Sequence, residues 1–130
     1  MFSQKLATCK TIFGGNCIMN HIVEELEDTL KNLGIIILEN WNDKLTYVIA
    51  VRNKEKVFVI CTSRYKHYFY REHCLRLFEL TEHIPFDSVK VGIDTDFMLS
   101  YVYAVTHSEK CKVNYDKCMS VNEVIHLLNS

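Results

Sequence analysis

Two continuous apolar runs joined by a short polar turn restrict the possible folds of this chain more than any other feature of the sequence. The runs cover residues 45–51 and 57–62, and Arg52-Asn53-Lys54-Glu55 lies between them. This spacing predicts two strands of a β-hairpin. Neither run alternates apolar with polar residues, as a strand with one solvated face would. We therefore expect both strands to be covered on both faces, within a sheet that helices flank.

A helix and a further strand are predicted before the hairpin. Leucines and isoleucines recur at helical spacing through residues 20–33, acidic residues fill the opposite face, and Gly34 follows as a stop signal. The β-branched run 35–38 predicts a short strand that ends in the polar turn 40–43. Trp41, the one large aromatic residue of that turn, is expected to fold back onto the sheet.

The second half of the chain predicts further helices and one more strand. The amphipathic segment 66–83 predicts a long helix that ends before Pro85, and 88–93 is typical of a fourth strand. Asp94 or Thr95 is placed to cap the helix that follows. The polar stretch 107–118 is interpreted as a solvated connection.

The C-terminal residues complete the predicted order of elements. Ser120 and Glu123 form a capping-box pattern at the start of a last helix. We expect one α/β (α+β) domain over residues 1–130, in which a mixed four-stranded sheet is flanked by helices in the order α-β-β-β-α-β-α-α. Residues 1–18 show no clear period and are expected to form an irregular N-terminal arm.

Composition narrows the class of protein. The chain has 130 residues, of which 48% are hydrophobic and 24% charged, enough for a core without metal or disulfide staples. A net charge of −1 gives no support for a broad nucleic-acid-binding face. No apolar run approaches the ~20 residues of a membrane helix, so no membrane partner is expected.

The cysteines predict a reducing environment. Six are present, at positions 9, 17, 61, 74, 111 and 118, and both Cys61 and Cys74 fall inside apolar segments, where free cysteine behaves as a small hydrophobe. No secretory signal is visible at the start of the sequence. We therefore expect an intracellular protein of the cytoplasm or nucleus.

The segment 46–84 resembles the core of the PD-(D/E)XK nuclease superfamily. Thr46-Tyr47-Val48-Ile49-Ala50 is similar to the strand that carries the first catalytic acid, and Lys56-Val57-Phe58-Val59-Ile60-Cys61-Thr62-Ser63 to the next strand, before an aromatic and basic helix. The resemblance implies Mg²⁺-dependent phosphodiester cleavage. It places the two acids on Tyr47 and Cys61 and the lysine on Ser63, and none of these side chains performs that chemistry.

The resemblance therefore implies a fold whose active site is lost. Glu24 or Glu25 matches the accessory glutamate of the first helix, but one carboxylate does not hold a catalytic metal pair. The alternative is a nuclease that uses other acids at strand ends, for which Glu39, Asp43 and Glu55 are the candidates.

The most distinctive segment alternates basic and aromatic side chains directly after the second hairpin strand. This composition grips backbone phosphates and stacks on bases, and Tyr and Arg also dominate protein interfaces. An ordinary helix start with solvated charges is the alternative. We predict a binding surface here, for a protein in preference to nucleic acid, formed by Arg64, Tyr65, Lys66, His67, Tyr68 and Arg71.

Metal, cofactor and catalytic sites are not predicted. His67, His73, Cys74 and His83 lack the paired spacing of zinc ligands, and Cys111 and Cys118 lie too far apart for a knuckle. Asp94 and Asp96 are better explained as helix caps, and no glycine-rich phosphate loop is present. The sequence predicts a non-enzymatic interaction module with a regulatory or host-interaction role, with self-association left open. A metal-dependent nuclease is the alternative.

Overall fold

The computed structural model describes residues 18–43, 45–63 and 74–130. Over these residues the chain forms an α+β domain with a five-stranded antiparallel sheet. The elements are, in order, α2 (Ile18–Asn32), β1 (Ile36–Asn42), β2 (Thr46–Asn53), β3 (Lys56–Ser63), β4 (Leu75–Leu80), the 3-10 helix η2 (Phe86–Ser88), α3 (Phe97–Thr106), β5 (Cys111–Met119) and α4 (Val121–Leu128).

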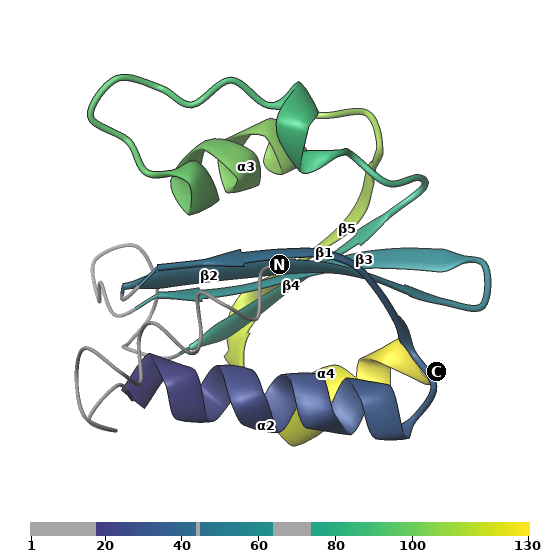
Figure 1. Ribbon diagram of the computed structural model, residues 1–130. Coiled ribbons are helices and arrows are strands. Elements are labelled where there is room, and N and C mark those ends of the chain that lie inside the picture. The colour runs from purple at the N-terminus through teal and green to yellow at the C-terminus, as the bar shows by residue number, and fades with distance from the viewer. Residues whose placement is uncertain (1–17, 44, 64–73) are drawn as a thin grey trace.

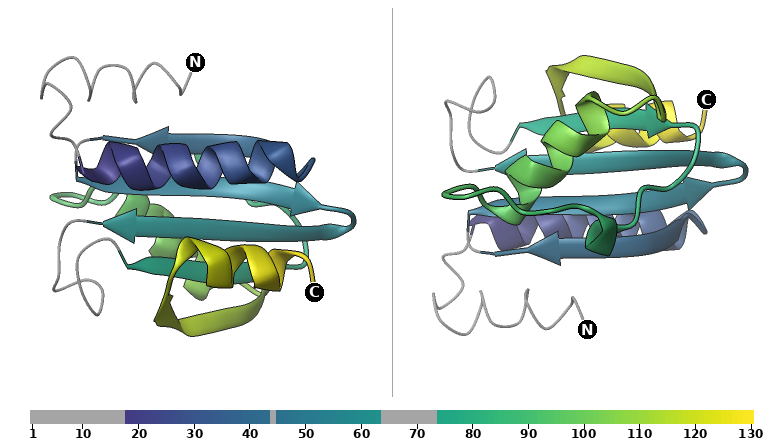
Figure 2. Two further views of the ribbon diagram at one scale, coloured as in Figure 1. Left: turned by 90° about the horizontal axis from the view of Figure 1, so that it is seen from below. Right: turned by 90° about the horizontal axis from the view of Figure 1, so that it is seen from above.

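The strands lie in the sheet in the order in which they occur in the chain, β1-β2-β3-β4-β5, and every neighbouring pair is antiparallel (Figure 1). Helices α2 and α4 cover one face of the sheet, while α3 and the η2 connection lie on the other (Figures 1 and 2). The predicted flanking of the sheet by helices is therefore confirmed. Within the described residues, no helix is long and apolar enough to cross a membrane.

Helix α2 ends where the sequence predicts. Gly34 adopts a φ of +74°, which glycine reaches without steric cost. The Ile35 N–H donates to the Leu30 carbonyl and the Gly34 N–H to the Lys31 carbonyl, both at 3.0 Å. These two bonds form a Schellman motif that satisfies the last carbonyls of the helix and turns the chain into β1.

The predicted hairpin is confirmed as β2 and β3. Asn53 pairs with Lys56, so the loop is only Lys54-Glu55, and Lys54 has the positive φ of 60° that a tight two-residue hairpin loop requires. Both strands are buried on both faces, as the continuous apolar runs predict. Side chains alternate between two cores: Tyr47 and Ile49 face α2 and α4, whereas Val48 faces α3.

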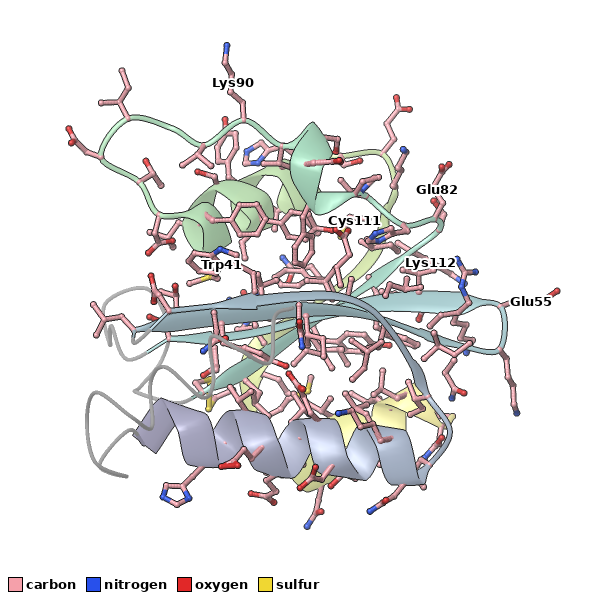
Figure 3. All side chains as sticks on the ribbon, viewed as in Figure 1. Trp41, Glu55, Glu82, Lys90, Cys111 and Lys112 are labelled. Carbon is pink, nitrogen blue, oxygen red and sulfur yellow. A yellow bond between two sulfur atoms is a disulfide. The ribbon has the colours of Figure 1, made fainter. Side chains whose placement is uncertain are left out.

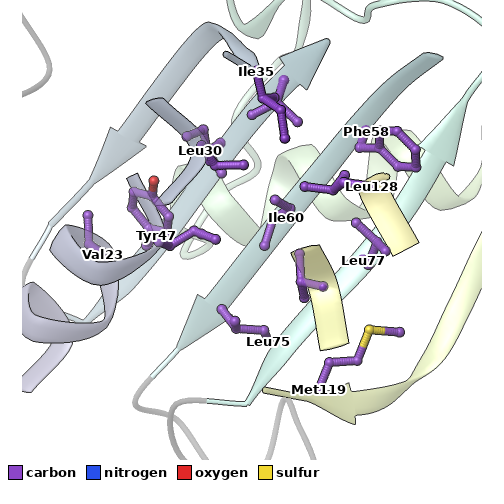
Figure 4. Close-up of a cluster of buried hydrophobic side chains, with 14 residues drawn as sticks. Val23, Leu30, Ile35, Tyr47, Phe58, Ile60, Leu75, Leu77, Met119 and Leu128 are labelled. Carbon is purple, nitrogen blue, oxygen red and sulfur yellow. The ribbon is translucent and has the colours of Figure 1, made fainter. Parts of the chain in front are cut away.

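The core under α2 and α4 is aliphatic and holds one buried aromatic ring from each of β2 and β3 (Figure 4). The core under α3 is more aromatic: Phe97 lies 5.3 Å from Trp41 and 5.1 Å from Phe86, and Phe86 lies 4.7 Å from Tyr101, measured between ring centroids. Trp41 thus lies between the sheet and α3, as the prediction that it folds back onto the sheet requires (Figure 3).

The prediction of a long helix over 66–83 is wrong for the residues that the structure describes, because Leu75–Leu80 forms strand β4. Leu75 and Leu77 face one core, while Phe78 and Leu80 face the other. A short strand buried on both faces carries apolar side chains at helical and at alternate spacing alike, so periodicity alone does not separate the two. Residues 64–73 lie outside the described part of the chain.

Two further predictions in the second half are wrong. The polar stretch 107–118, interpreted as a connection, contains strand β5, whose alternating exposure is that of a sheet edge. The fourth strand predicted over 88–93 is absent, and Phe86–Ser88 forms η2 instead. The sequence predicts a mixed sheet of four strands, whereas the structure has an antiparallel sheet of five strands. The observed order of elements is α-β-β-β-β-α-β-α.

Both later helices begin at side-chain caps. Asp96, one of the two aspartates that the sequence assigns to helix capping, caps α3 by accepting a 2.8 Å hydrogen bond from the Leu99 N–H, and Asp94 and Thr95 do not. Helix α4 has the predicted capping box: Ser120 accepts from the Glu123 N–H, and the Glu123 carboxylate accepts from the Ser120 N–H. The capping hydrogen bonds also lower the pKa of Glu123.

A disulfide joins the start of β4 to the end of β5. Cys74 and Cys118 are bonded, and their Cα atoms lie 5.0 Å apart, within the usual range for such a bond. Cys74 is fully buried. The expectation that Cys74 acts as a free apolar residue is therefore wrong, whereas Cys61 and Cys111 are free.

We expect reduction of this disulfide to destabilise the domain. The bond closes a loop over a sequence separation of 44 residues, for which chain entropy gives about 4 kcal/mol. Thermal unfolding with and without dithiothreitol should show a loss of about 2–4 kcal/mol. Cys118→Ser should show the same loss and no further response to reductant; equal stability under both conditions would contradict the prediction.

Candidate functional site

The binding residues predicted from the sequence, Arg64, Tyr65, Lys66, His67, Tyr68 and Arg71, all lie outside the described residues. The segment that contains them connects β3 to β4, between Ser63 and Cys74. The binding role of this segment therefore remains a prediction. The described residues show other arrangements that bear on function.

The positions that the nuclease resemblance assigns to catalysis do not face one side of the sheet. Tyr47 lies in the core under α2 and α4, whereas Cys61 lies in the core under α3. Tyr47 pairs with Thr62, and Ser63 pairs with Thr46. Burial raises the pKa of the Cys61 thiol to about 12, so it stays protonated at neutral pH.

Glu27, and not Glu24 or Glu25, turns toward this part of the sheet. Its carboxylate is 5% exposed and accepts hydrogen bonds from the Tyr47 hydroxyl at 2.8 Å and the Asn40 amide at 2.7 Å. Burial, with the neighbouring Glu27 charge, raises the pKa of Tyr47 well above its usual value. Two donors on one buried carboxylate give this group a structural role in fastening α2 to β1 and β2.

The alternative acids do not come together. Asp43 accepts from the Leu45 and Thr46 N–H groups in the β1–β2 turn, both at 2.8 Å, whereas Glu55 lies at the far tip of the β2–β3 hairpin (Figure 3). The eight residues of β2 separate these two turns, about 25 Å at 3.3 Å per residue. One cation with ligands at about 2.0–2.6 Å cannot bind both.

The third of these acids, Glu39, forms a partly buried pair with a histidine. Its Oε2 lies 2.6 Å from His83 Nε2 and accepts the Phe86 N–H at 2.9 Å. The His83 Nδ1 atom is buried and has no hydrogen-bond partner among the described residues. The pair joins β1 to the connection that leads into η2. No local sequence pattern signals it, because the two partners are 44 residues apart.

The histidines and cysteines considered for zinc are dispersed. Cys74 and Cys118 are joined to each other, His83 is paired with Glu39, and His67 and His73 lie outside the described residues. Among the residues that are described, no group of three or more His, Cys, Asp or Glu side chains is placed to hold a metal ion.

The most exposed large apolar side chain among the described residues, that of Ile93, lies in the connection between η2 and α3, and Ile36 on β1 is a separate exposed residue at 57%. Ile93 is 93% exposed and Val91 is 51% exposed. On α3, Tyr103 is 65% exposed, and its ring stacks on His107 with the centroids 4.0 Å apart. Lys90 points away from the sheet (Figure 3). We call Lys90, Val91, Ile93, Tyr103 and His107 the α3-side surface.

This connection is fastened to the domain by hydrogen bonds. The Gly92 N–H donates to Ser100 Oγ at 3.1 Å, the Thr95 N–H donates to the Gly92 carbonyl at 3.3 Å, and the Thr95 hydroxyl donates to the Ile93 carbonyl at 3.1 Å. A Cβ at Gly92 would lie 3.1 Å from Thr95 Oγ1, so a larger residue here would require the Thr95 side chain to shift. Ile93 is therefore held at the surface.

We expect the Glu27–Tyr47 bond to stabilise the fold. Tyr47→Phe should lower the free energy of unfolding by about 1–2 kcal/mol, because a buried carboxylate loses one of its donors. Glu27→Leu should cost about as much by leaving the tyrosine hydroxyl unpaired. Urea unfolding of both single variants and the double variant checks this; additive losses would show that the two groups are not coupled.

Alkaline pH should destabilise the domain through its buried tyrosines. Burial raises the pKa of Tyr101, whose hydroxyl donates to the Ile84 carbonyl, above its ordinary value of 10.0. Above about pH 10 the unfolded chain loses this proton and the folded chain keeps it, so stability falls by up to about 1.4 kcal/mol per pH unit. Urea midpoints across this range should fall less steeply for Tyr101→Phe; identical slopes would contradict the prediction.

Comparison of the chain with known protein families, with curated protein sequences and with solved structures finds no match.

Proposed function

We propose that this chain is a non-enzymatic interaction module that binds a protein partner through the α3-side surface. The observation that carries the proposal is the exposure of Ile93, at 93%, in a connection that the Gly92–Ser100 hydrogen bond fastens to α3. Covering a large exposed apolar side chain with a partner is favourable, by about 25 cal/mol for each Å² of apolar surface removed from water.

The composition of the surface supports a protein partner in preference to nucleic acid. Val91, Ile93 and Tyr103 are apolar or aromatic, and Lys90 is the only lysine or arginine among the five residues of this surface. Nucleic-acid contacts depend on several cations close together, whereas the centre of a protein interface is depleted of charge and enriched in aromatic residues.

In this proposal the nuclease-like resemblance describes a scaffold without the catalytic acids, acting as a regulatory or host-interaction factor. Arg64, Tyr65, Lys66, His67, Tyr68 and Arg71 are a second predicted contact segment. Binding of DNA or RNA by that segment is the competing function, and Mg²⁺-dependent cleavage is the alternative activity.

Ile93→Asp should weaken partner binding at least tenfold, about 1.4 kcal/mol, because it places a charge where an apolar contact is buried. Proteins captured from the source cells by the wild-type chain are identified, purified and titrated against both forms. Asn122→Asp, which adds a charge at an exposed position of α4 on the opposite face, is the matched control and should leave the affinity unchanged.

Three results would overturn the proposal. Equal affinity of the wild type and Ile93→Asp for the identified partner would show that the partner does not bind at the α3-side surface. Salt-sensitive binding of labelled DNA or RNA that is lost in Arg64→Ala/Lys66→Ala/Arg71→Ala would establish a nucleic-acid-binding module instead. Cleavage of those oligonucleotides in the presence of Mg²⁺ would establish the nuclease.

A further inference from the structure

The C-terminal residues 118–130 are attached to the rest of the domain at both of their ends. At the start, the Cys74–Cys118 disulfide joins them to β4. At the end, the Asn53 amide donates to the Leu128 carbonyl at 2.7 Å, and Lys56 Nζ donates to the Ser130 carbonyl at 3.2 Å. Helix α4 lies between these attachments, on the face of the sheet that it shares with α2 (Figure 2). We call residues 118–130 the C-terminal strap.

The disulfide lies where the pairing of β5 with β4 is irregular. Leu77 pairs with Tyr115 and Leu75 pairs with Met119, so two steps along β4 correspond to four steps along β5. Extra residues of this kind disrupt the ladder of backbone hydrogen bonds locally. The covalent bond at Cys118 therefore holds a part of β5 that a regular ladder does not hold.

The preceding part of β5 has an attachment of its own. Arg76 donates to Asn114 Oδ1 at 2.9 Å and forms an ion pair with Asp116, with 3.4 Å between Nη2 and Oδ1. These contacts do not involve the disulfide. They would keep this part of β5 on β4 when the bond is open, so a movement of the strap would begin after Asp116.

Helix α4 depends on its attachments because it is short. It has eight residues, and isolated helices shorter than about 12–15 residues are only marginally stable in water. Its capping box, formed by Ser120 and Glu123, lies within the strap and does not join it to the sheet. Its buried side chains are those of Val124 and Leu128. Few packing contacts thus hold the helix on the sheet between its two attached ends.

The strap covers apolar side chains of the sheet. Leu128 lies beside Phe58 and Leu77 in the core under α2 and α4 (Figure 4). Met119, at the start of the strap, belongs to the same core and is 2% exposed. Detachment of the strap would therefore uncover an apolar area on β3 and β4.

We infer that the Cys74–Cys118 bond is a redox switch for α4. In the oxidised chain the strap is held on the sheet. In the reduced chain it detaches and uncovers the apolar side chains of β3 and β4. The switch lies on the face of the sheet opposite the α3-side surface, so it is a regulatory device separate from the binding proposed there (Figure 1).

The switch operates by thiol–disulfide exchange with a low-molecular-weight thiol such as glutathione. Cys74 is fully buried and Cys118 is partly exposed, so the attacking thiolate reaches the Cys118 sulfur. The S–S bond breaks, a mixed disulfide forms at Cys118, and the Cys74 sulfur leaves with the electron pair and takes up a proton. A second thiolate releases Cys118 in the same way. Two small thiols are thus oxidised to their disulfide while the protein disulfide is reduced to two thiols, and the reverse exchange closes the bond again.

Hydrogen exchange of the oxidised and the reduced chain, followed by mass spectrometry, tests the switch. Reduction should speed the exchange of the α4 amides at least about tenfold more than that of the β2 and β3 amides, because α4 then opens without unfolding of the sheet. A loss of stability of the whole domain would speed exchange in all three elements alike. Equal acceleration in α4, β2 and β3, or no acceleration, would overturn the switch.

Two variants assign the response to this bond. Cys118→Ser should show the α4 exchange of the reduced wild type and should not respond to reductant. Cys111→Ser, at a free and partly exposed cysteine at the start of the same strand, is the matched control and should keep the wild-type response. A response that persists in Cys118→Ser would overturn the assignment. The comparison of oxidised and reduced wild type needs no substitution and holds if that variant fails to fold.

The switch also requires that the bond opens in the folded chain. Reduced glutathione without denaturant should open it, and iodoacetamide should then label Cys74 and Cys118 but not the buried Cys61. A bond that glutathione opens only in urea would be a permanent staple, and the switch would be overturned. Capture of a partner by the wild-type chain and its loss in Ile93→Asp test the proposed function separately.

Discussion

The fold depends on the burial of β2 and β3 on both faces. Each carries apolar side chains at successive positions, so a sheet containing them has no face that water can solvate favourably. Two covering layers are therefore obligatory. Helices α2 and α4 supply one, and α3 with the η2 connection supplies the other (Figure 2). The positions of the other elements follow from which part of the sheet each layer covers.

The two layers are fastened differently. On the α2 side, aliphatic packing is supplemented by the buried Glu27 carboxylate, which binds both β1 and β2. On the α3 side, packed aromatic rings are supplemented by Glu39, which binds His83 and the Phe86 N–H. Both carboxylates bind residues distant in the chain. Each therefore contributes to fixing one layer on the sheet, at a desolvation cost that its hydrogen bonds offset.

The sequence identified the elements whose signals are local. The Gly34 stop of α2, the β2–β3 hairpin and the capping box at Ser120 each depend on residues within a few positions of one another. The sequence analysis assigned β4 to a helix, because a strand buried on both faces also has apolar residues at helical spacing. It assigned β5 to a polar connection, because its exposed residues Lys112, Asn114 and Asp116 alternate with Val113 and Tyr115 and make the segment polar on average. The Glu39–His83 pair and the Cys74–Cys118 bond depend on chain topology, which no local pattern contains.

The error over 88–93 carries the most information about function. The residues have the composition of a strand, and the core gains nothing by pairing them, because β4 and β5 already lie side by side at that end of the sheet. The hydrogen bond from the Gly92 N–H to Ser100 Oγ holds the segment against α3, and Ile93 is exposed to water. Mismatches between local pattern and structure are expected at functional or strained sites, which is why we propose this segment as part of a binding surface. The disagreement between pattern and structure thus points to the α3-side surface.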